Sequence, residues 1–107
     1  MSKLANKNCK PHNETTILAT EQIPILLKQV GDWKITNTQL QRKFKFKDYH
    51  QTMAFVNAVV WIAHQQDHHP EMLVNYNHCS IRYSSHSVGG LSENDFICAA
   101  KIDGLLE

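Results

Sequence analysis

Four histidines in the second half of the chain have types and spacing suited to proton transfer. His64 and His68 stand in the pattern H-x-x-x-H, His69 follows directly and precedes Pro70, and His86 comes later. An imidazole has an unperturbed pKa of about 6.5, so it can donate or accept a proton near neutral pH. The cluster therefore favours a general acid–base site over a solvated loop.

The proline after the paired histidines predicts how they are presented. An apolar helical pattern runs from about residue 49 to residue 63, and Pro70 cannot continue a helix. The residue before a proline is driven out of the α region into extended geometry. We therefore expect His68 at the very end of this helix and His69 on the outgoing strand, with both rings facing one cavity.

Periodicity along the chain predicts the elements that hold this corner. Apolar residues recur at helical spacing in three segments, and apolar and polar residues alternate in four. This order predicts an α+β fold: a four-stranded antiparallel sheet with three helices packed on one face. The expected elements are a helix at 21–30, strands at 33–36 and 40–47, a helix at 49–68, strands at 72–76 and 79–83, and a helix at 93–105.

Length and composition limit the domain organisation and the classes of partner. With 107 residues, the chain has room for one core; we expect a mobile polar tail at 1–16 and a single domain at 17–107. The net charge of +1 gives no electrostatic basis for strong nucleic-acid binding, and no apolar run is long enough to cross a membrane. Three cysteines without C-x-x-C spacing indicate reduced thiols and a cytoplasmic protein.

The final helix predicts self-association. Its main apolar stripe includes Phe96 and Ile102, yet Ile97 and Cys98 are apolar on other sides. A helix that is apolar over more than one face usually buries more than one face. A neighbouring subunit could cover the second face, so we expect a homo-oligomer. Trp61 and Tyr76 could stack on a ligand, but we interpret both as core residues. The remaining histidines are interpreted as surface or satisfied core residues: His12, His50 and His78.

The histidine cluster also carries a family resemblance. The run H-x-x-x-H-H-P, then Tyr76, then S-S-H at His86 and G-G-L-S-E-N-D at Asp95, resembles the pterin-4a-carbinolamine dehydratase family over roughly residues 32–106. The resemblance implies a cytoplasmic hydro-lyase that removes water from 4a-hydroxytetrahydropterin to give quinonoid dihydropterin, in the recycling of a tetrahydrobiopterin-type cofactor. It implies no metal and no cofactor, assembly as a homodimer or homotetramer, and a functional link to an aromatic amino acid hydroxylase.

The resemblance also suggests roles for individual residues. His68, His69 and His86 match the family's three active-site histidines; we expect His68 and His86 to transfer protons and His69 to position the substrate. Pro70 matches the proline that fixes the corner. Asp95 has two compatible interpretations: it stabilises the start of the last helix, or it orients a histidine or binds the guanidine-like edge of the pterin.

Two alternatives remain at this stage. His64 stands where many family members carry glutamate, and its helical spacing from His68 is also a zinc-ligand spacing. His64 is otherwise expected to orient the substrate. The second alternative concerns function, because relatives of this family also act as dimerisation partners or transcriptional coactivators. A non-catalytic binding module with the same fold is therefore the competing hypothesis.

Overall fold

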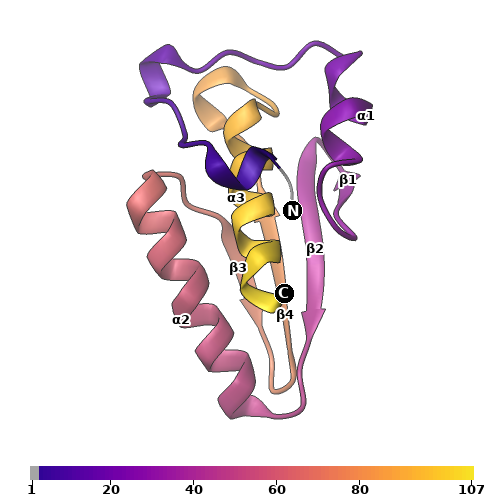
Figure 1. The fold of residues 1–107 in the computed structure, drawn as a ribbon. Helices are drawn as coiled ribbons and strands as arrows, with labels where there is room; N and C mark the ends of the chain where they lie inside the picture. Colours follow the sequence, from indigo (N-terminus) through magenta and orange to yellow (C-terminus); the bar gives the residue numbers. More distant parts are fainter. Residues whose placement is uncertain (1–2) are drawn as a thin grey trace.

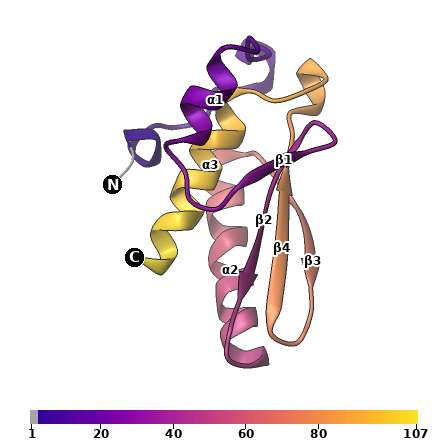
Figure 2. The same ribbon diagram turned by 90° about the vertical axis from the view of Figure 1, so that its right-hand side faces the viewer.

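The structure is a computed structural model that describes residues 3–107, and it confirms the expected α+β architecture. Four antiparallel strands form one sheet in the order β1-β2-β4-β3. The three α-helices lie on one side of this sheet (Figure 1, Figure 2). The elements are the 3-10 helices η1 (Lys3–Asn6) and η2 (His12–Glu14), α1 (Gln22–Leu27), β1 (Lys34–Thr36), β2 (Gln39–Lys45), α2 (Tyr49–Gln66), β3 (Glu71–Val74), β4 (His78–Tyr83), η3 (His86–Val88), α3 (Glu93–Asp103) and η4 (Gly104–Leu106).

The two central strands of the sheet carry the strand side of the core. Both expected hairpins form, β1 with β2 and β3 with β4, and β2 joins β4 with Phe44 opposite Cys79 and Leu40 opposite Tyr83. These four side chains are buried, while their neighbours along each strand are less so. The sheet thus has one apolar face, on which α2 and α3 pack.

The central helix ends two residues earlier than the sequence predicts. α2 stops at Gln66, and Asp67 adopts a left-handed conformation with φ 49°. The His68 N–H donates to Ala63 O at 3.1 Å, and the Asp67 N–H donates to His64 O at 3.2 Å. These two bonds close the helix in the manner of a Schellman motif, with aspartate in place of the usual glycine. His68 therefore lies beyond the helix and not at its last turn.

Part of the predicted tail at 1–16, from residue 3 onward, packs against the rest of the domain. Leu4 is buried in the core, and η1 packs on α3. The Lys101 ammonium on α3 donates to Ala5 O at 2.8 Å. The second apolar face of α3 is therefore covered by the chain itself, which removes the argument for an oligomer based on Ile97 and Cys98.

Some large apolar side chains expected in the core lie on the surface instead. Trp61 on α2 is 61% exposed and Tyr76, between β3 and β4, is 64% exposed. Trp61 lies on the solvent-facing side of α2, and Tyr76 lies in the connection between β3 and β4, so apolar character alone did not predict their burial. Within residues 3–107, no helix combines the length and apolar content needed to span a membrane.

Candidate functional site

The corner after α2 buries one of the paired histidines and exposes the other. His68 is 4% exposed, whereas His69 faces solvent. The Tyr83 hydroxyl on β4 donates to His68 O at 3.1 Å, and the two rings stack with centroids 5.0 Å apart. Burial raises the pKa of Tyr83, so this hydroxyl keeps its proton and remains a donor. The backbone and the ring of His68 are thus both held by β4.

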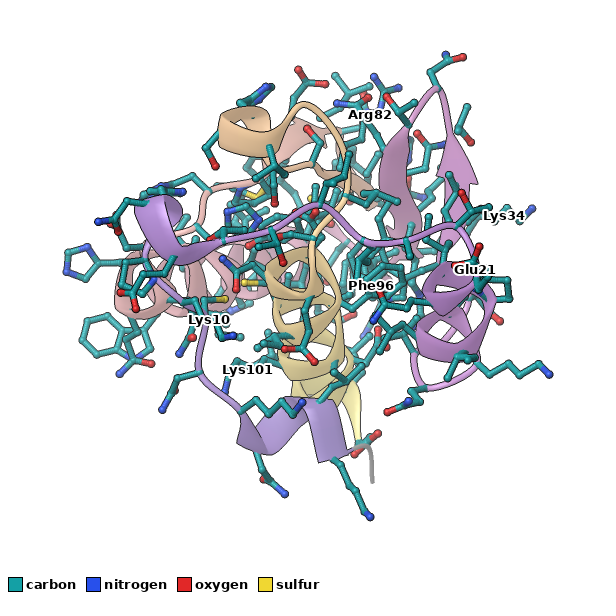
Figure 3. The ribbon with its side chains drawn as sticks, turned by 90° about the horizontal axis from the view of Figure 1, so that it is seen from above. Lys10, Glu21, Lys34, Arg82, Phe96 and Lys101 are labelled. Carbon is teal, nitrogen blue, oxygen red and sulfur yellow. The ribbon has the colours of Figure 1, made fainter. Side chains whose placement is uncertain are left out.

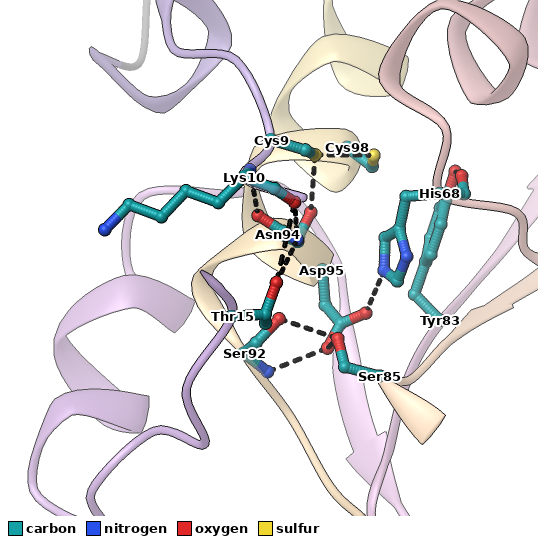
Figure 4. A network of polar contacts seen from close by, with 10 residues as sticks. All are labelled: Cys9, Lys10, Thr15, His68, Tyr83, Ser85, Ser92, Asn94, Asp95 and Cys98. Atoms are coloured by element: carbon teal, nitrogen blue, oxygen red, sulfur yellow. Dashed lines mark hydrogen bonds and ion pairs between the residues drawn. The ribbon is translucent and has the colours of Figure 1, made fainter. Parts of the chain in front are cut away.

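A buried carboxylate orients the His68 ring. Asp95, fully buried in the first turn of α3, places Oδ1 2.6 Å from Nε2 of His68 (Figure 4). Its Oδ2 accepts hydrogen bonds from the Ser85 hydroxyl at 3.0 Å and from the Ser92 N–H at 2.9 Å. The bond to Ser92 is one half of a capping box. Asp95 therefore stabilises the start of α3 and also orients a histidine. Its burial leaves no surface for direct contact with a ligand.

The Asp95 contact also selects the tautomer of His68. An ionised carboxylate only accepts hydrogen bonds, so Nε2 of His68 carries the proton that it donates to Oδ1. In the neutral imidazole, the other ring nitrogen, Nδ1, then carries the lone pair. A histidine whose one nitrogen is fixed by a carboxylate is in the arrangement used by general bases in hydrolases.

The histidines of the predicted trio gather around one hollow. Its volume is about 280 Å³, close to the lower end of the range for small-molecule sites. His86 enters from η3, just after β4, and is exposed, as is His69. A larger hollow of about 680 Å³ beside the end of α3 is lined by no histidine. The smaller hollow is lined by His12, His68, His69, Ser84, His86 and Ser87.

His64 does not reach this hollow. It lies in the last turn of α2, exposed, with its ring centroid 6.1 Å from that of Trp61. Because α2 ends before His68, the two histidines do not occupy successive turns of one helix. The zinc alternative loses the spacing on which it depended, and residues 3–107 contain no group of three His, Cys, Asp or Glu side chains placed to hold a metal.

Two thiols lie directly behind the network around Asp95. Cys9 Sγ and Cys98 Sγ are 3.6 Å apart, with Cys98 fully buried and Cys9 half-buried. A hydrogen bond from the Cys98 thiol lowers the pKa of Cys9. The same hydrogen bond, together with burial, raises the pKa of Cys98. Cys9 is therefore the thiol that ionises first.

The structure thus unites some predicted site residues and separates others. His68, His69 and His86 line one hollow, and Asp95 reaches this group through its contact with His68. Pro70 follows His69 directly in the chain, and His64 does not line the hollow. The sequence interpretation overlooked Tyr83 and Ser85, although Tyr83 belongs to an alternating strand and so had a predictable inward face. It also assigned His12 no role, because no local pattern relates residue 12 to residues 68–86.

Comparison with known proteins finds relatives over nearly the whole chain. The family model for pterin 4 alpha carbinolamine dehydratase matches residues 16–105. A protein of Nitrosomonas eutropha is 53% identical over 96% of this chain and 93% of its own length, and one of Nitrosospira multiformis is 51% identical over 97% and 93%; both carry the name "Putative pterin-4-alpha-carbinolamine dehydratase".

Two solved structures share the fold. A transcriptional coactivator/pterin dehydratase from Brucella melitensis superimposes with a TM-score of 0.80 at 27% identity, covering 84% of this chain and 98% of that one. A pterin dehydratase-like protein identified as a RuBisCO assembly factor of the alpha-carboxysome gives a TM-score of 0.61 at 24% identity, covering 70% and 89%. At that identity the second similarity concerns the fold alone.

Proposed function

Because this chain belongs to the pterin 4 alpha carbinolamine dehydratase family, we propose that it catalyses the dehydration of a 4a-hydroxytetrahydropterin to quinonoid dihydropterin. The observation that carries the proposal is the hollow lined by His68, His69 and His86, in which the His68 ring is fixed by Asp95. Binding alone gives no reason to orient one imidazole with a buried carboxylate, whereas proton transfer does.

The reaction requires two proton movements and no electron transfer. The hydroxyl on C4a leaves as water once it is protonated, and the adjacent ring nitrogen loses its proton as its lone pair forms the C=N bond. We assign these movements to His68 and His86, and substrate positioning to His69. His68 would act through Nδ1, because Nε2 is engaged by Asp95. General acid–base catalysis of this kind contributes about 10²–10⁴ in rate.

The proposal needs no metal or redox cofactor, since the ring nitrogens of the pterin supply the electrons that expel the hydroxyl. The substrate would come from an aromatic amino acid hydroxylase, whose spent pterin carries this hydroxyl group. The competing hypothesis is a binding module of the same fold. The Brucella melitensis structure is described as both coactivator and dehydratase, so the fold itself does not separate the two.

Stopped-flow absorbance of 4a-hydroxytetrahydropterin dehydration tests the proposal directly. We expect the wild-type chain to accelerate the reaction with and without a chelator. His68→Ala and His86→Ala should each lower kcat by about 10²–10⁴. His78→Ala is the matched control, because His78 is the first residue of β4, its ring contacts Asn75, and it does not line the hollow. A wild-type chain that gives only the uncatalysed rate would reject the dehydratase and favour the binding module.

A further inference from the structure

The segment from Cys9 to Thr15 is fastened across the start of α3 by one buried side chain. Asn94, 4% exposed, accepts a hydrogen bond from the Lys10 N–H at 3.0 Å through Oδ1. Its Nδ2 donates to Lys10 O at 3.0 Å and to Thr15 Oγ1 at 3.2 Å. Figure 3 shows the N-terminal segment passing over the first turn of α3, and Figure 4 shows these bonds. Both ends of the segment are therefore fixed on α3.

These hydrogen bonds place His12 at the hollow that His68 lines. His12 begins η2, between the two anchored residues, and its ring centroid lies 6.2 Å from that of His68. It lines the same hollow as His69 and His86. Among residues 3–107 its ring nitrogens make no hydrogen bond, so its polar groups are available to a molecule in the hollow.

Neighbouring side chains thus present two histidines to one space. Asp95 orients His68 from behind, and Asn94, the preceding residue, holds the segment that carries His12. Because both contacts lie in the first turn of α3, they bring the segments that carry the two histidines close together. Leu4 alone would suffice to cover the apolar surface of α3. The hydrogen bonds that Asn94 makes with Lys10 and Thr15 are not needed for that purpose.

We propose that His12 is a fourth histidine of the site, which contacts the bound pterin and contributes to its binding. The inference rests on the proposed dehydratase function and extends it, because His12 lies outside the residues 16–105 that the family model matches. The ligand class is a bicyclic pterin, whose ring nitrogens, carbonyl and amino group offer hydrogen-bond partners to an imidazole.

Its role is binding and not proton transfer, because the two proton movements of the proposed reaction are already assigned to His68 and His86. Among the described residues no carboxylate contacts a ring nitrogen of His12, which is exposed and lines the hollow. An exposed imidazole can still donate or accept a hydrogen bond to a ligand in the hollow. We therefore expect His12→Ala to raise KM about 3–10-fold, the size of one ordinary hydrogen bond, with kcat changed by less than about 2-fold.

Kinetics with matched variants separate this role from a structural one. His12→Gln, which keeps a donor and an acceptor, should recover most of the lost KM. His50→Ala is the surface control, because His50 lies in the first turn of α2, roughly 24 Å from its last residue. Asn94→Ala should raise KM like His12→Ala, and the double variant should add little to either single change. Unchanged KM in His12→Ala, or full additivity in the double variant, would overturn the proposal.

A binding measurement keeps this inference distinct from the proposed activity. In proton NMR of the full chain titrated with 7,8-dihydropterin, the ring signals of His12, His68, His69 and His86 should shift, and those of His50 and His78 should not. Movement of the trio without His12 would overturn the role of His12 alone. If no histidine signal moves at saturating dihydropterin, both the pterin site and the role of His12 are rejected.

Discussion

His68 Nε2 lies 2.6 Å from Asp95 Oδ1, although 27 residues separate the two in the chain. The same carboxylate uses its other oxygen to accept from the Ser92 N–H at the start of α3. One side chain therefore begins a helix and orients a ring of the candidate site. Any variant at this position changes both, unless it preserves one of the two contacts.

Asp95→Asn preserves the helix start and changes the ring. The amide oxygen of the side chain in this variant can still accept from the Ser92 N–H. The amide NH2 group then faces Nε2 of His68, where a donor replaces the carboxylate oxygen. The ring must turn to the tautomer with the proton on Nδ1, the nitrogen assigned to proton transfer. We expect kcat to fall by about 10²–10⁴ while the melting temperature changes little. Stopped-flow kinetics and thermal unfolding measure the two effects.

Asp95→Ala is the companion variant, because it removes both contacts. It should lose the same activity and in addition about 0.5–2 kcal/mol of stability from the missing cap. Full activity in Asp95→Asn would show that the carboxylate serves α3 alone and that the tautomer of His68 is irrelevant to turnover.

The parts of the fold that the sequence predicted depend on short-range patterns. Alternation along β2 and β4 follows from which face of the sheet is buried, and Ser92 begins α3 because its neighbours in the chain complete the cap. Pro70 predicted a corner between His68 and His69 for the same reason: a proline constrains the residue before it whatever the rest of the chain does. The grouping of His68, His69 and His86 was predicted from the spacing that they share with the family motif.

The parts that the sequence did not predict depend on contacts between distant segments. α2 ends at Gln66 because Asp67 tolerates a left-handed conformation, which its type permits but does not require. Leu4 stands among mostly polar residues in the N-terminal segment. It is buried because this segment packs on α3, a contact that no local pattern predicts. His12 follows the same rule, because the side chain that positions its segment is Asn94 on α3.

The packing of the N-terminal segment predicts a measurable loss of stability on truncating Leu4. Leu4 is 2% exposed, so Leu4→Ala should lower the free energy of unfolding by about 2–3 kcal/mol. Ile25→Ala is the matched control; Ile25 is 62% exposed on α1, and its truncation should cost less than about 0.5 kcal/mol. Urea unfolding compares the two. Equal midpoints would mean that residues 3–6 contribute no packing in solution.

The expected oligomer has a different candidate surface from the one that α3 suggested. On α2, Val60 is 48% exposed and Trp61 is 61% exposed, and we expect a second copy of the chain to cover them. Trp61→Glu places a charge in this face and should reduce the mass in solution to that of the 12.3 kDa monomer. Sedimentation velocity at several concentrations measures it, with His50→Glu as the control. A wild-type monomer would show the predicted oligomer to be wrong.

The close approach of Cys9 to Cys98 predicts an intramolecular disulfide under mild oxidation. The two sulfurs are 3.6 Å apart, and closing the bond requires a shift of about 1.6 Å to the usual S–S length. With glutathione disulfide as oxidant, the Cys9 thiolate would attack one sulfur and release glutathione; Cys98 would then displace the second glutathione. Because the pKa of Cys9 is lowered, the first step should proceed faster below the ordinary thiol pKa of about 8.5 than for an unperturbed cysteine.

The disulfide would join segments 89 residues apart and so restrict the unfolded chain strongly. We expect the oxidised protein to lose about 2 Da in intact mass and to gain about 2–4 kcal/mol of stability. It should retain its activity, because the bond would fasten the segment that presents His12 in its present place. Cys98→Ser should abolish the mass change, and Cys79→Ser, at a buried thiol on β4, should not. A stable mixed disulfide with glutathione on Cys9 would show that Cys98 cannot reach it in solution.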